Sequence, residues 1–595
     1  MSLRAAAALR VTIALGFLTL TVSDFAAATD KPSLVVVISV DQMRADYLDR
    51  FRPWFGEDGF KRFLEHGAVF PRAAHRHATT FTAPGHASIG SGLDPRDHGI
   101  IGNRWFDATS GTSVYCTEDP DVAFVPAPAP GQAPLTKAAS PGLTTSVFLG
   151  DRLKQKFPGA RVLGIALKDR AAVLMAGRKA DAAIWFEEKN ARFVTSTYYP
   201  PHPELLAIND TLPAFFAAHR TWDLSGRIPP AALDAATFDP PELYSAKSPP
   251  AGFGDTFPHP LRTPKAVVSS PFGDELVLAL ARSVIEKWSL GSRGGEPDLL
   301  FVGLSSTDYY GHAFGPDSKE IADGIVRLDA TLQAFFGWLD GRVGAGRTMT
   351  FLTADHGVTP LPEVARAKYR KRTGKDDPSI AGRVNLDNHG GDAGKVSDGS
   401  AERLAIERAV AKRFGYSLDE SAPNFREGAV LFFEEPGLYL NKAALARRGA
   451  PIEAVKEAVR DLVRAMPGVQ TAYDNTEIAD GLPPDAPHAL AVARSFRADR
   501  SGDIFVLLKP GWMWSYGKES GTTHGQPNDD DVRVPLAVWG PGVAPGSYDT
   551  ATSPLAIART VAKLFDFEAG EPDVAPLQPV VGAAATAASA AASPR

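Results

Sequence analysis

The stretch LVVVISVDQ, residues 34–42, is a mainly apolar run, rich in β-branched residues, that ends at the carboxylate of Asp41. A run without polar alternation is typical of a strand buried on both faces of a parallel sheet. Four later runs share the pattern: RVLGIALKDR (161–170), DLLFVGLSSTD (298–308), TMTFLTADHG (348–357) and RVPLAVWGPG (533–542). We therefore expect these five runs to form strands of one mostly parallel sheet.

Helical patterns lie between the predicted strands. GDELVLALARSVIEKW (273–288) and KEIADGIVRLDATLQAFFGWLDGRV (319–343) place apolar residues three and four positions apart, which gives each segment an apolar face. Strands that alternate with such helices indicate an α/β fold, in which a doubly wound, mostly parallel sheet is flanked by helices.

The ends of the chain differ in composition from its body. Residues 1–28 combine early arginines, an apolar stretch at 11–22 and small residues at 26–28, which is the pattern of a secretory signal peptide. The main catalytic domain is predicted at 30–575. A subdomain is expected to be inserted into it at about 361–500, because that region has its own helical patterns and a strand-like segment. The Ala-rich tail, 576–595, is expected to be disordered.

The composition of the chain excludes several classes of protein. It has 595 residues, a formal net charge of -6, 44% hydrophobic residues and 22% charged residues, which is the profile of a soluble globular protein. This balance gives no sign of a nucleic-acid-binding surface. The apolar part of the predicted signal is shorter than the about 20 residues that span a bilayer, so we expect no stable membrane insertion and a periplasmic or secreted protein.

Polar residues gather where the predicted strands end. Asp41, Asp308 and the pair Asp355–His356 each follow a buried run. A single aspartate after a strand is more commonly a turn or cap residue. In an open α/β sheet, however, functional groups lie beyond the carboxyl ends of the strands, and several such residues together favour a shared site.

Two histidines complete a set of six residues with metal-ligand chemistry. STDYYGH supplies Asp308 and His312, four positions apart, and SGTTHGQP supplies His524. Side chains four positions apart lie on one face of a helix. Three carboxylates and three imidazoles suit two divalent ions with mixed nitrogen and oxygen ligands, and zinc fits best, although other divalent ions are possible.

The segment HATTFTAPGHASIGSGLDPRDHGIIGN, residues 77–103, offers several hydroxyl groups. Neither Ser88 nor Ser91 lies in the G-x-S-x-G pattern of a serine hydrolase. A metal-activated hydroxyl would instead lie where a loop enters a helix, with backbone N–H groups free to face a phosphate. Thr82 fits this position, because Pro84 follows it early in the first turn, where a missing N–H costs little.

These motifs resemble those of the alkaline phosphatase superfamily. VVVISVDQMRADYL, TFTAPGHASIGSG, HGIIGNRWFD, STDYYGH, TADHG and TTHGQP are similar to that family's motifs and stand in its usual order, from about residue 33 to 565. The nearest resemblance is to exported alkaline phosphatases with a threonine nucleophile, which are related to nucleotide pyrophosphatase/phosphodiesterases. It implies hydrolysis of small-molecule phosphate monoesters through a phosphothreonine intermediate, with two zinc ions.

The resemblance also implies a role for each matching residue. Thr82 matches the nucleophile and a metal ligand. The metal group beside the nucleophile matches Asp41, Asp355 and His356, and the group on the leaving side matches Asp308, His312 and His524. Asn103 matches an asparagine that binds a phosphate oxygen, and Lys168 and Arg170 match a K-x-R pair of the monoesterases.

Lys168 and Arg170 bear on the choice between monoester and diester. A phosphate monoester carries close to two negative charges at alkaline pH, whereas a diester carries one. An ammonium and a guanidinium match the extra charge and the extra terminal oxygens. The alternative is that both are solvated charges at the end of a strand.

Two other functions stay open at this point. One is a phosphodiesterase or nucleotide pyrophosphatase of the same superfamily, and the other is a catalytically inactive binding protein with the same fold. A sulfatase would need a C/S-x-P-x-R segment, whereas TAPGH stands at 82–86 and lacks that arginine.

We expect the protein to be a monomer. The Asp- and Gly-rich segment at 385–399 departs from EF-hand spacing, so an exposed loop is favoured there over a calcium site.

Overall fold

The computed structural model describes residues 31–578 and 580, except 108, 134, 136–137, 387–399, 419–427 and 516–519. The predicted signal peptide, the tail from residue 581 onward and most of the Asp- and Gly-rich loop lie outside the described residues. None of the helices in the part of the chain that the structure describes is long and apolar enough to cross a membrane.

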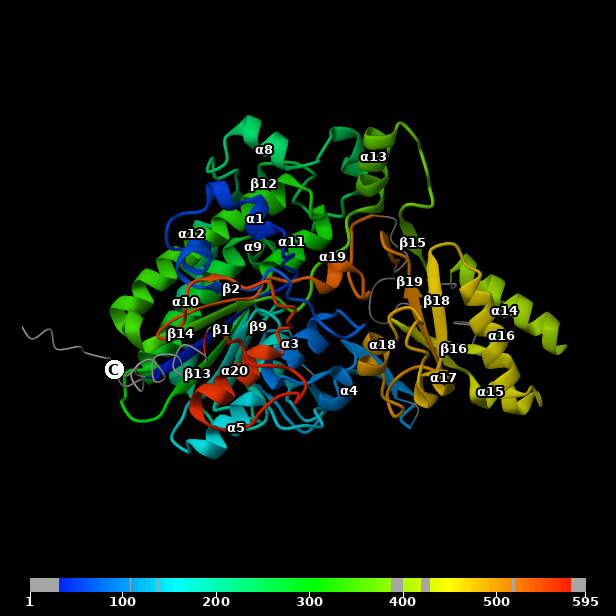
Figure 1. The fold of residues 1–595 in the computed structure, drawn as a ribbon, viewed down its shortest axis with the longest axis horizontal. Helices are drawn as coiled ribbons and strands as arrows, with labels where there is room; N and C mark the ends of the chain where they lie inside the picture. The colour runs from blue at the N-terminus through cyan, green and yellow to red at the C-terminus, as the bar shows by residue number, and fades with distance from the viewer. Residues whose placement is uncertain are drawn as a thin grey trace, which may run out of the picture.

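A ten-stranded mixed sheet forms the centre of the protein (Figure 1). The five runs predicted as strands all belong to it, as β1 (Leu34–Val40), β8 (Val162–Ala166), β13 (Asp298–Leu304), β14 (Thr348–Thr353) and β21 (Ala537–Trp539). The strand order is β22-β2-β21-β14-β1-β13-β8-β9-β10-β6. Its outer strands are β22 (Gly546–Ser547), β2 (Ala68–Val69), β10 (Arg192–Ser196) and β6 (Phe124–Val125). β14, β1, β13, β8 and β9 (Ala182–Glu187) run parallel, whereas β21 pairs antiparallel with β14. The predicted doubly wound, mostly parallel sheet is therefore confirmed.

Helices cover both faces of this sheet, because alternate residues of β1 enter two different hydrophobic clusters. Val36 and Ile38 pack in the cluster that holds α10 (Phe272–Trp288) and α12 (Lys319–Arg342), which include the two predicted helices. Val35 and Val37 pack on the other side, with α6 (Asp169–Ala176) and α20 (Ala556–Phe565). Figure 1 shows α10 and α12 on one side of the sheet and α20 on the other. This layering leaves the carboxyl ends of the parallel strands as the edge where a site can form.

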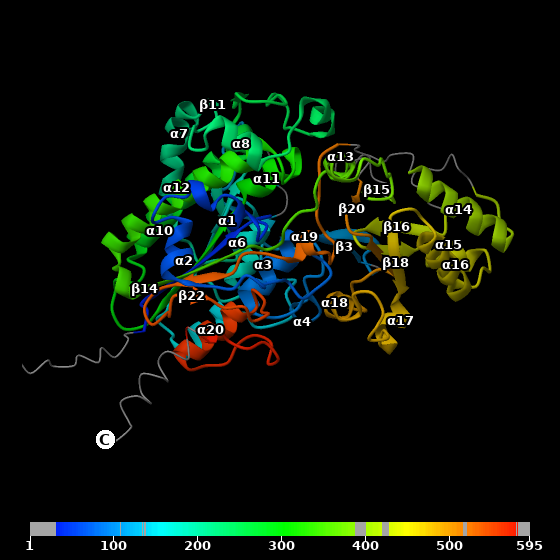
Figure 2. The ribbon, with the colours of Figure 1, turned by 45° about the horizontal axis from the view of Figure 1, so that its top comes forward.

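A second, antiparallel sheet lies at one end of the molecule (Figures 1 and 2). It has the order β16-β17-β19-β18 and the bounds β16 (Val430–Glu434), β17 (Gly437–Leu440), β18 (Val469–Asp474) and β19 (Ile504–Leu508). The helices α14 (Ala401–Phe414) and α16 (Ile452–Arg464) pack on it in a separate hydrophobic cluster. The inserted subdomain, with its boundaries near 361 and 500, stays a prediction; β19 follows its predicted end.

Two short helices carry key residues of the predicted site and approach each other closely. α3 (Thr82–Ser91) begins at Thr82, and α6 begins just after Lys168. They pack together where α3 has a glycine: a Cβ on Gly90 would lie 2.5 Å from the backbone oxygen of Met175 and 2.6 Å from its Cα. Gly90 thus sets the distance between the helix of Thr82 and the helix of Arg170.

We predict that Gly90→Ala lowers the free energy of unfolding by about 1–3 kcal/mol, because overpacking against backbone forces the two helices apart. Gly337→Ala is the matched control, since Gly337 lies within α12 with no atom within 4 Å of its added Cβ. That control is expected to be neutral or stabilising by up to about 1 kcal/mol. Differential scanning calorimetry would measure both, and equal melting temperatures for the two variants would contradict the packing argument.

Candidate active site

The six predicted metal-ligand residues meet at the carboxyl ends of three adjacent strands. Asp41 follows β1, Asp355 and His356 follow β14, and Asp308 and His312 lie on α11 (Ser306–Phe314), directly after β13. His524 comes from the loop before α19 (Asp529–Val532). The ligand atoms of Asp308, His312 and His524 lie within 4.8 Å of one another, as do those of Asp41, Asp308 and His356.

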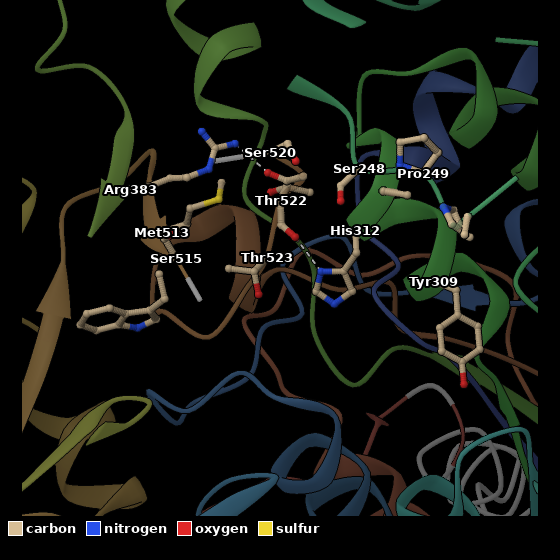
Figure 3. Close-up of a pocket in the computed structure, with 15 residues that line it drawn as sticks. Ser248, Pro249, Tyr309, His312, Arg383, Met513, Ser515, Ser520, Thr522 and Thr523 are labelled. Atoms are coloured by element: carbon tan, nitrogen blue, oxygen red, sulfur yellow. Dashed lines mark hydrogen bonds between the residues drawn. The ribbon is translucent and has the colours of Figure 1, made fainter. Parts of the chain in front are cut away.

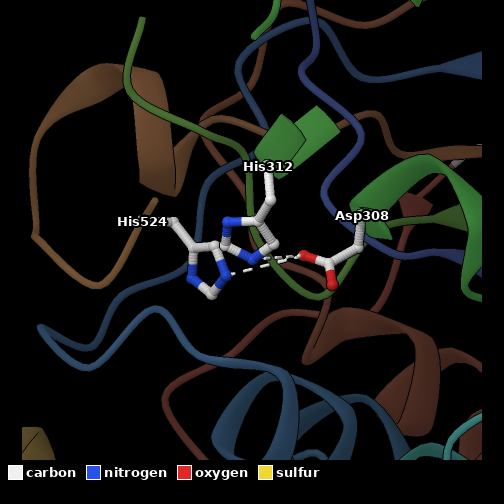
Figure 4. A group of neighbouring side chains, drawn as sticks. All are labelled: Asp308, His312 and His524. Atoms are coloured by element: carbon white, nitrogen blue, oxygen red, sulfur yellow. Dashed lines mark ion pairs between the residues drawn. The ribbon is translucent and has the colours of Figure 1, made fainter. Parts of the chain in front are cut away.

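The leaving-side group converges on one carboxylate (Figure 4). Nε2 of His312 lies 3.1 Å from Oδ1 of Asp308, and Nε2 of His524 lies 3.6 Å from the same oxygen. The group expected beside the nucleophile is also in contact. Nε2 of His356 lies 3.3 Å from Oδ2 of Asp355 and 3.5 Å from Oδ1 of Asp41. The structure therefore brings Asp308, His312 and His524 together as predicted. His356 contacts Asp41 and Asp355, but the sets whose ligand atoms all lie within 4.8 Å of one another join Asp41 to Asp308 and His356, and Asp41 to Asp355 and His86.

Backbone carbonyls orient the three imidazoles. Nδ1 of His312 donates to the carbonyl of Thr522 at 2.7 Å, and Nδ1 of His524 donates to that of Thr80 at 2.7 Å. Nδ1 of His356 donates to Gly357 at 2.9 Å. A carbonyl oxygen can only accept, so each Nδ1 carries a proton and each Nε2 faces the cluster. This is the arrangement that orients histidine ligands in metal sites.

The carboxylates of Asp41, Asp308 and Asp355 form a buried cluster of negative charge. Burial, together with Asp355, raises the pKa of Asp41 well above its usual value. Burial alone would raise the pKa of Asp308 too, but His312 and Lys168 hold it well below. Burial lowers the pKa of both His356 and His524, which keeps these rings in the neutral form that binds metals.

The donor set fits two divalent cations. Within the part of the chain that the structure describes, Oδ1 of Asp41, Oδ2 of Asp355 and Nε2 of His356 are buried without a hydrogen-bond partner. Buried charges are normally paired or coordinate metals, and three carboxylates face a single ammonium, that of Lys168. A metal centre would supply the missing positive charge and the missing partners, whereas the chemistry of the ligands alone does not distinguish zinc from other divalent ions.

Thr82 stands at the N-terminus of α3, beside this cluster. The first turn of α3 touches Asp355, since a Cβ on Gly85 would lie 2.3 Å from the Asp355 carbonyl oxygen. His86 strengthens the contact: its Nδ1 lies 2.9 Å from the Thr82 carbonyl oxygen and 3.2 Å from Oδ2 of Asp355. Thr82 is therefore the first residue of a helix that contacts Asp355, a predicted metal ligand.

Asn103 lies at the same helix N-terminus. Its Oδ1 accepts a hydrogen bond from the backbone N–H of Ala83 at 2.9 Å. Because the side-chain oxygen is used in this way, the amide nitrogen of Asn103 is the group left for an anion. The position agrees with a role in holding a phosphate oxygen next to Thr82, and this role stays a prediction.

Lys168 and Arg170 follow β8, on the neighbouring strand. The Lys168 ammonium lies 2.7 Å from Oδ2 of Asp41 and 2.5 Å from Oδ2 of Asp308. It thus bridges the two predicted metal groups instead of lying in solvent. The guanidinium of Arg170 contacts the hydroxyl of Tyr115 at 3.2 Å. Lys168 therefore contacts both predicted metal groups, and a role of Arg170 in binding phosphate stays a prediction.

Three of the competing hydroxyls of the 77–103 segment have structural partners, whereas that of Thr79 is buried without a hydrogen-bond partner among the described residues. The hydroxyl of Ser91 donates to the Ala87 carbonyl at 2.6 Å, and that of Ser88 lies 3.1 Å from Nε2 of His98. Thr80 donates to the Gln526 carbonyl at 3.0 Å. Three hydroxyls that compete with Thr82 for the role of nucleophile are therefore engaged in hydrogen bonds within the protein.

Sequence reasoning missed a residue at the centre of the site, Gln42. Its backbone N–H donates to Oδ1 of Asp355 at 3.1 Å, and its side-chain Nε2 donates to Oδ1 of Asp308 at 2.8 Å. Gln42 adopts φ 65°, which is uncommon for a residue other than glycine. Gly311 makes room for it, since a Cβ there would lie 2.0 Å from Oε1 of Gln42. The only signal in the sequence was its position directly after Asp41.

A second group that the sequence did not reveal holds Arg170. Tyr115 donates to Oδ1 of Asp169 at 2.8 Å, and Thr117 donates to Oδ2 of Asp169 at 2.5 Å. The Tyr115 hydroxyl in turn accepts from Arg170. Tyr115 comes from the strand β4 (Thr112–Tyr115), about 50 residues before its partners, and no motif marked it.

Comparison with known proteins agrees with this geometry. The family model of type I phosphodiesterases / nucleotide pyrophosphatases matches residues 35–530. Alkaline phosphatase PafA of Elizabethkingia meningoseptica is 31% identical over 91% of this chain and 93% of its own, and alkaline phosphatase PhoV of Synechococcus elongatus is 31% identical over 92% of each. The crystal structure of wild-type PafA superposes with a TM-score of 0.77 at 29% identity, covering 93% of this chain and 99% of PafA.

The chain therefore belongs to the type I phosphodiesterase / nucleotide pyrophosphatase family, within the alkaline phosphatase superfamily. Inside that family it is an alkaline phosphatase, a phosphoric monoester hydrolase similar to PafA and PhoV.

We predict that Gln42→Met weakens zinc binding by the apoprotein about tenfold or more, because the amide that orients Asp308 is lost while the length of the side chain is kept. Gly311→Ala should act in the same direction by displacing that amide. Competition with a chromophoric chelator measures the affinity without any substrate.

Gln155→Leu is the control for these two variants, because Gln155 lies exposed on α5 (Leu149–Lys156). Wild-type zinc affinity in both the Gln42 and the Gly311 variant would show that Gln42 does not position the metal ligands.

Proposed function

We propose that this alkaline phosphatase transfers the phosphoryl group of a monoester to Thr82, forming a phosphothreonine that water then hydrolyses, with two zinc ions bound at the site. One observation carries the proposal. Six residues with metal-ligand chemistry converge beside the N-terminus of α3, and the first residue of that helix carries a hydroxyl.

The two predicted trios would hold the ions. Asp41, Asp355 and His356 would hold one, with Thr82 as a further ligand, and Asp308, His312 and His524 would hold the other. Such a pair of ions lowers the pKa of a hydroxyl nucleophile and stabilises the charge that develops on a leaving oxygen.

The residues of the chain then bind and orient the phosphoryl group. N–H groups at the start of α3 face it, since a helix N-terminus favours an anion. The amide nitrogen of Asn103 donates to a phosphate oxygen, and Thr82 attacks phosphorus from the side of Asp41. The leaving oxygen departs on the side of Asp308, in line with the attack.

Lys168 and Arg170 favour monoesters over diesters. The Lys168 ammonium bridges Asp41 and Asp308, so it stands next to the position proposed for the transferred group. Tyr115 and Asp169 hold the Arg170 guanidinium nearby. Two cations match the second negative charge of a monoester and have less to offer a diester.

We propose further that the protein is exported and acts as a monomer on small-molecule phosphate esters in the periplasm or outside the cell. The signal-like pattern of residues 1–28 supports export.

Thr82→Ala should reduce turnover of p-nitrophenyl phosphate by about a thousandfold or more, because the covalent step loses its nucleophile. Thr82→Ser is the matched variant, since it keeps a hydroxyl at the same position, and it should retain measurable activity. Wild-type enzyme treated with a chelator and then with zinc reports on the metal requirement in the same assay. Near-normal activity of Thr82→Ala would exclude the proposed intermediate.

Arg170→Ala should lower kcat/KM for p-nitrophenyl phosphate at least about tenfold more than kcat/KM for bis-p-nitrophenyl phosphate, because a charge-assisted contact to the extra oxygens is lost. Arg152→Ala serves as the control, since Arg152 is exposed on α5. A wild-type enzyme that strongly prefers the diester would reverse the assignment of Lys168 and Arg170.

A further inference from the structure

The ammonium of Lys247 is buried directly after the 3-10 helix η3 (Pro241–Ala246), and the side chain is 3% exposed. Its Nζ lies 3.0 Å from Oδ1 of Asp239 and 3.4 Å from Oε1 of Glu320, and those two side chains are 6% and 1% exposed. It also donates to the Asp255 carbonyl at 3.2 Å. Lysine is almost never fully buried unless it is paired, so these contacts hold the residue and the backbone on either side of it in one place.

The peptide groups on both sides of this lysine bond to the two segments that carry the histidines of the leaving-side group. The N–H of Ser248 donates to the carbonyl of Ala313 at 2.9 Å, one residue past the histidine of α11. The carbonyl of Ala246 accepts from the N–H of Gly521 at 2.7 Å, in the loop that leads to the other histidine. The 246–248 segment therefore joins the end of α11 to that loop.

The same two segments also bond directly to each other. The N–H of Thr522 donates to the His312 carbonyl at 2.9 Å, and the Thr522 carbonyl accepts from Nδ1 of His312, as Figure 3 shows. Little space is left between them: a Cβ on Gly521 would lie 3.0 Å from the His312 carbonyl oxygen and 3.1 Å from Cβ of Ser248. The three segments thus meet around the ring of His312, where Ser248 lines a pocket of about 490 Å³.

His312 depends on these contacts more than the other ligands of its group do. Its side chain is 36% exposed, whereas those of Asp308 and His524 are 6% and 5% exposed. A side chain that the core does not enclose on every side is placed by the hydrogen bonds of its ring and its backbone, and such partners orient histidine ligands in metal sites.

We propose that Lys247 is a positioning residue for the leaving-side metal group: its ion pairs with Asp239 and Glu320 fix the 246–248 segment, and that segment sets where His312 stands. The alternative is a buried ion pair that adds stability and nothing else. The inference rests on the proposed function, in which the ion of this group stabilises the charge on the leaving oxygen.

The first test measures metal binding by the apoprotein of the full chain. Lys247→Met keeps the length of the side chain and removes its charge. It should weaken the binding of one of two zinc ions about tenfold or more, because groups that orient metal ligands commonly contribute that much, and leave the affinity for the other ion unchanged. Competition with a chromophoric chelator measures both affinities, and the visible absorption of the protein loaded with Co²⁺ reports a change in coordination.

Lys456→Met is the matched control. Lys456 is a second buried lysine, 5% exposed, and it donates to Asn475 and Thr476 beside the second sheet, neither of which is a predicted ligand. This variant should lower the melting temperature without changing the affinity for either ion.

The second test compares kcat/KM for methyl phosphate and for p-nitrophenyl phosphate. The methyl ester releases the more basic oxygen, which carries more charge as it departs and relies more on the ion of the leaving side. Lys247→Met should therefore lower kcat/KM for methyl phosphate at least about fivefold more than kcat/KM for p-nitrophenyl phosphate. Equal losses on both substrates, together with wild-type affinity for both ions, overturn the proposal.

Glu320→Gln decides the question if Lys247→Met does not fold, because it leaves the ammonium paired with Asp239. It should shift metal affinity and the ratio of the two substrates in the same direction by a smaller factor, about threefold. Wild-type values of both in a folded Glu320→Gln protein would then contradict the inference.

The outcomes also separate this inference from the proposed function. If wild type neither binds two zinc ions nor hydrolyses either ester, the phosphatase mechanism fails. If wild type does both, and Lys247→Met changes only the melting temperature, as Lys456→Met does, the positioning role of Lys247 fails alone.

Discussion

The site depends on three carboxylates, Asp41, Asp308 and Asp355, that the fold forces together out of water. Like charges at such distances repel strongly where the dielectric constant is low, so the arrangement is stable only with cations among them. Lys168 supplies one positive charge from the chain. The remaining imbalance, and the imidazole nitrogens that face it, make this region suited to bind divalent metal ions.

The main sheet brings the three carboxylates close together, and the surrounding backbone holds them in place. The parallel strands β14, β1 and β13 end at the same edge of the sheet, so the residues that follow them lie close together. Backbone contacts then fix each group: carbonyls orient the imidazoles, and Gln42, in a strained conformation, donates to two of the carboxylates. Strain of this kind persists where the surrounding structure holds it in place, and it is common at functional sites.

The proposed recognition of the phosphoryl group depends on charge. Lys168 and Arg170, held by β8 and α6, are the cations proposed to respond to that charge. The pocket beside His312 lies on the other side of the cluster, and residues that precede or follow the second sheet build one of its walls.

The sequence alone determined the main sheet and its helices, because buried strands carry a continuous apolar pattern. It also predicted six metal-ligand residues that the structure brings close together, although their role as ligands stays a prediction. The position of Thr82 came from helix-entry chemistry, while the roles of Asn103, Lys168 and Arg170 depended on a family resemblance. Only the tertiary structure decided that Gln42 bridges two carboxylates, that Tyr115 holds Arg170 and that a pocket meets His312. These features join residues that are distant in the chain, or depend on a single backbone angle, and no local periodicity records either.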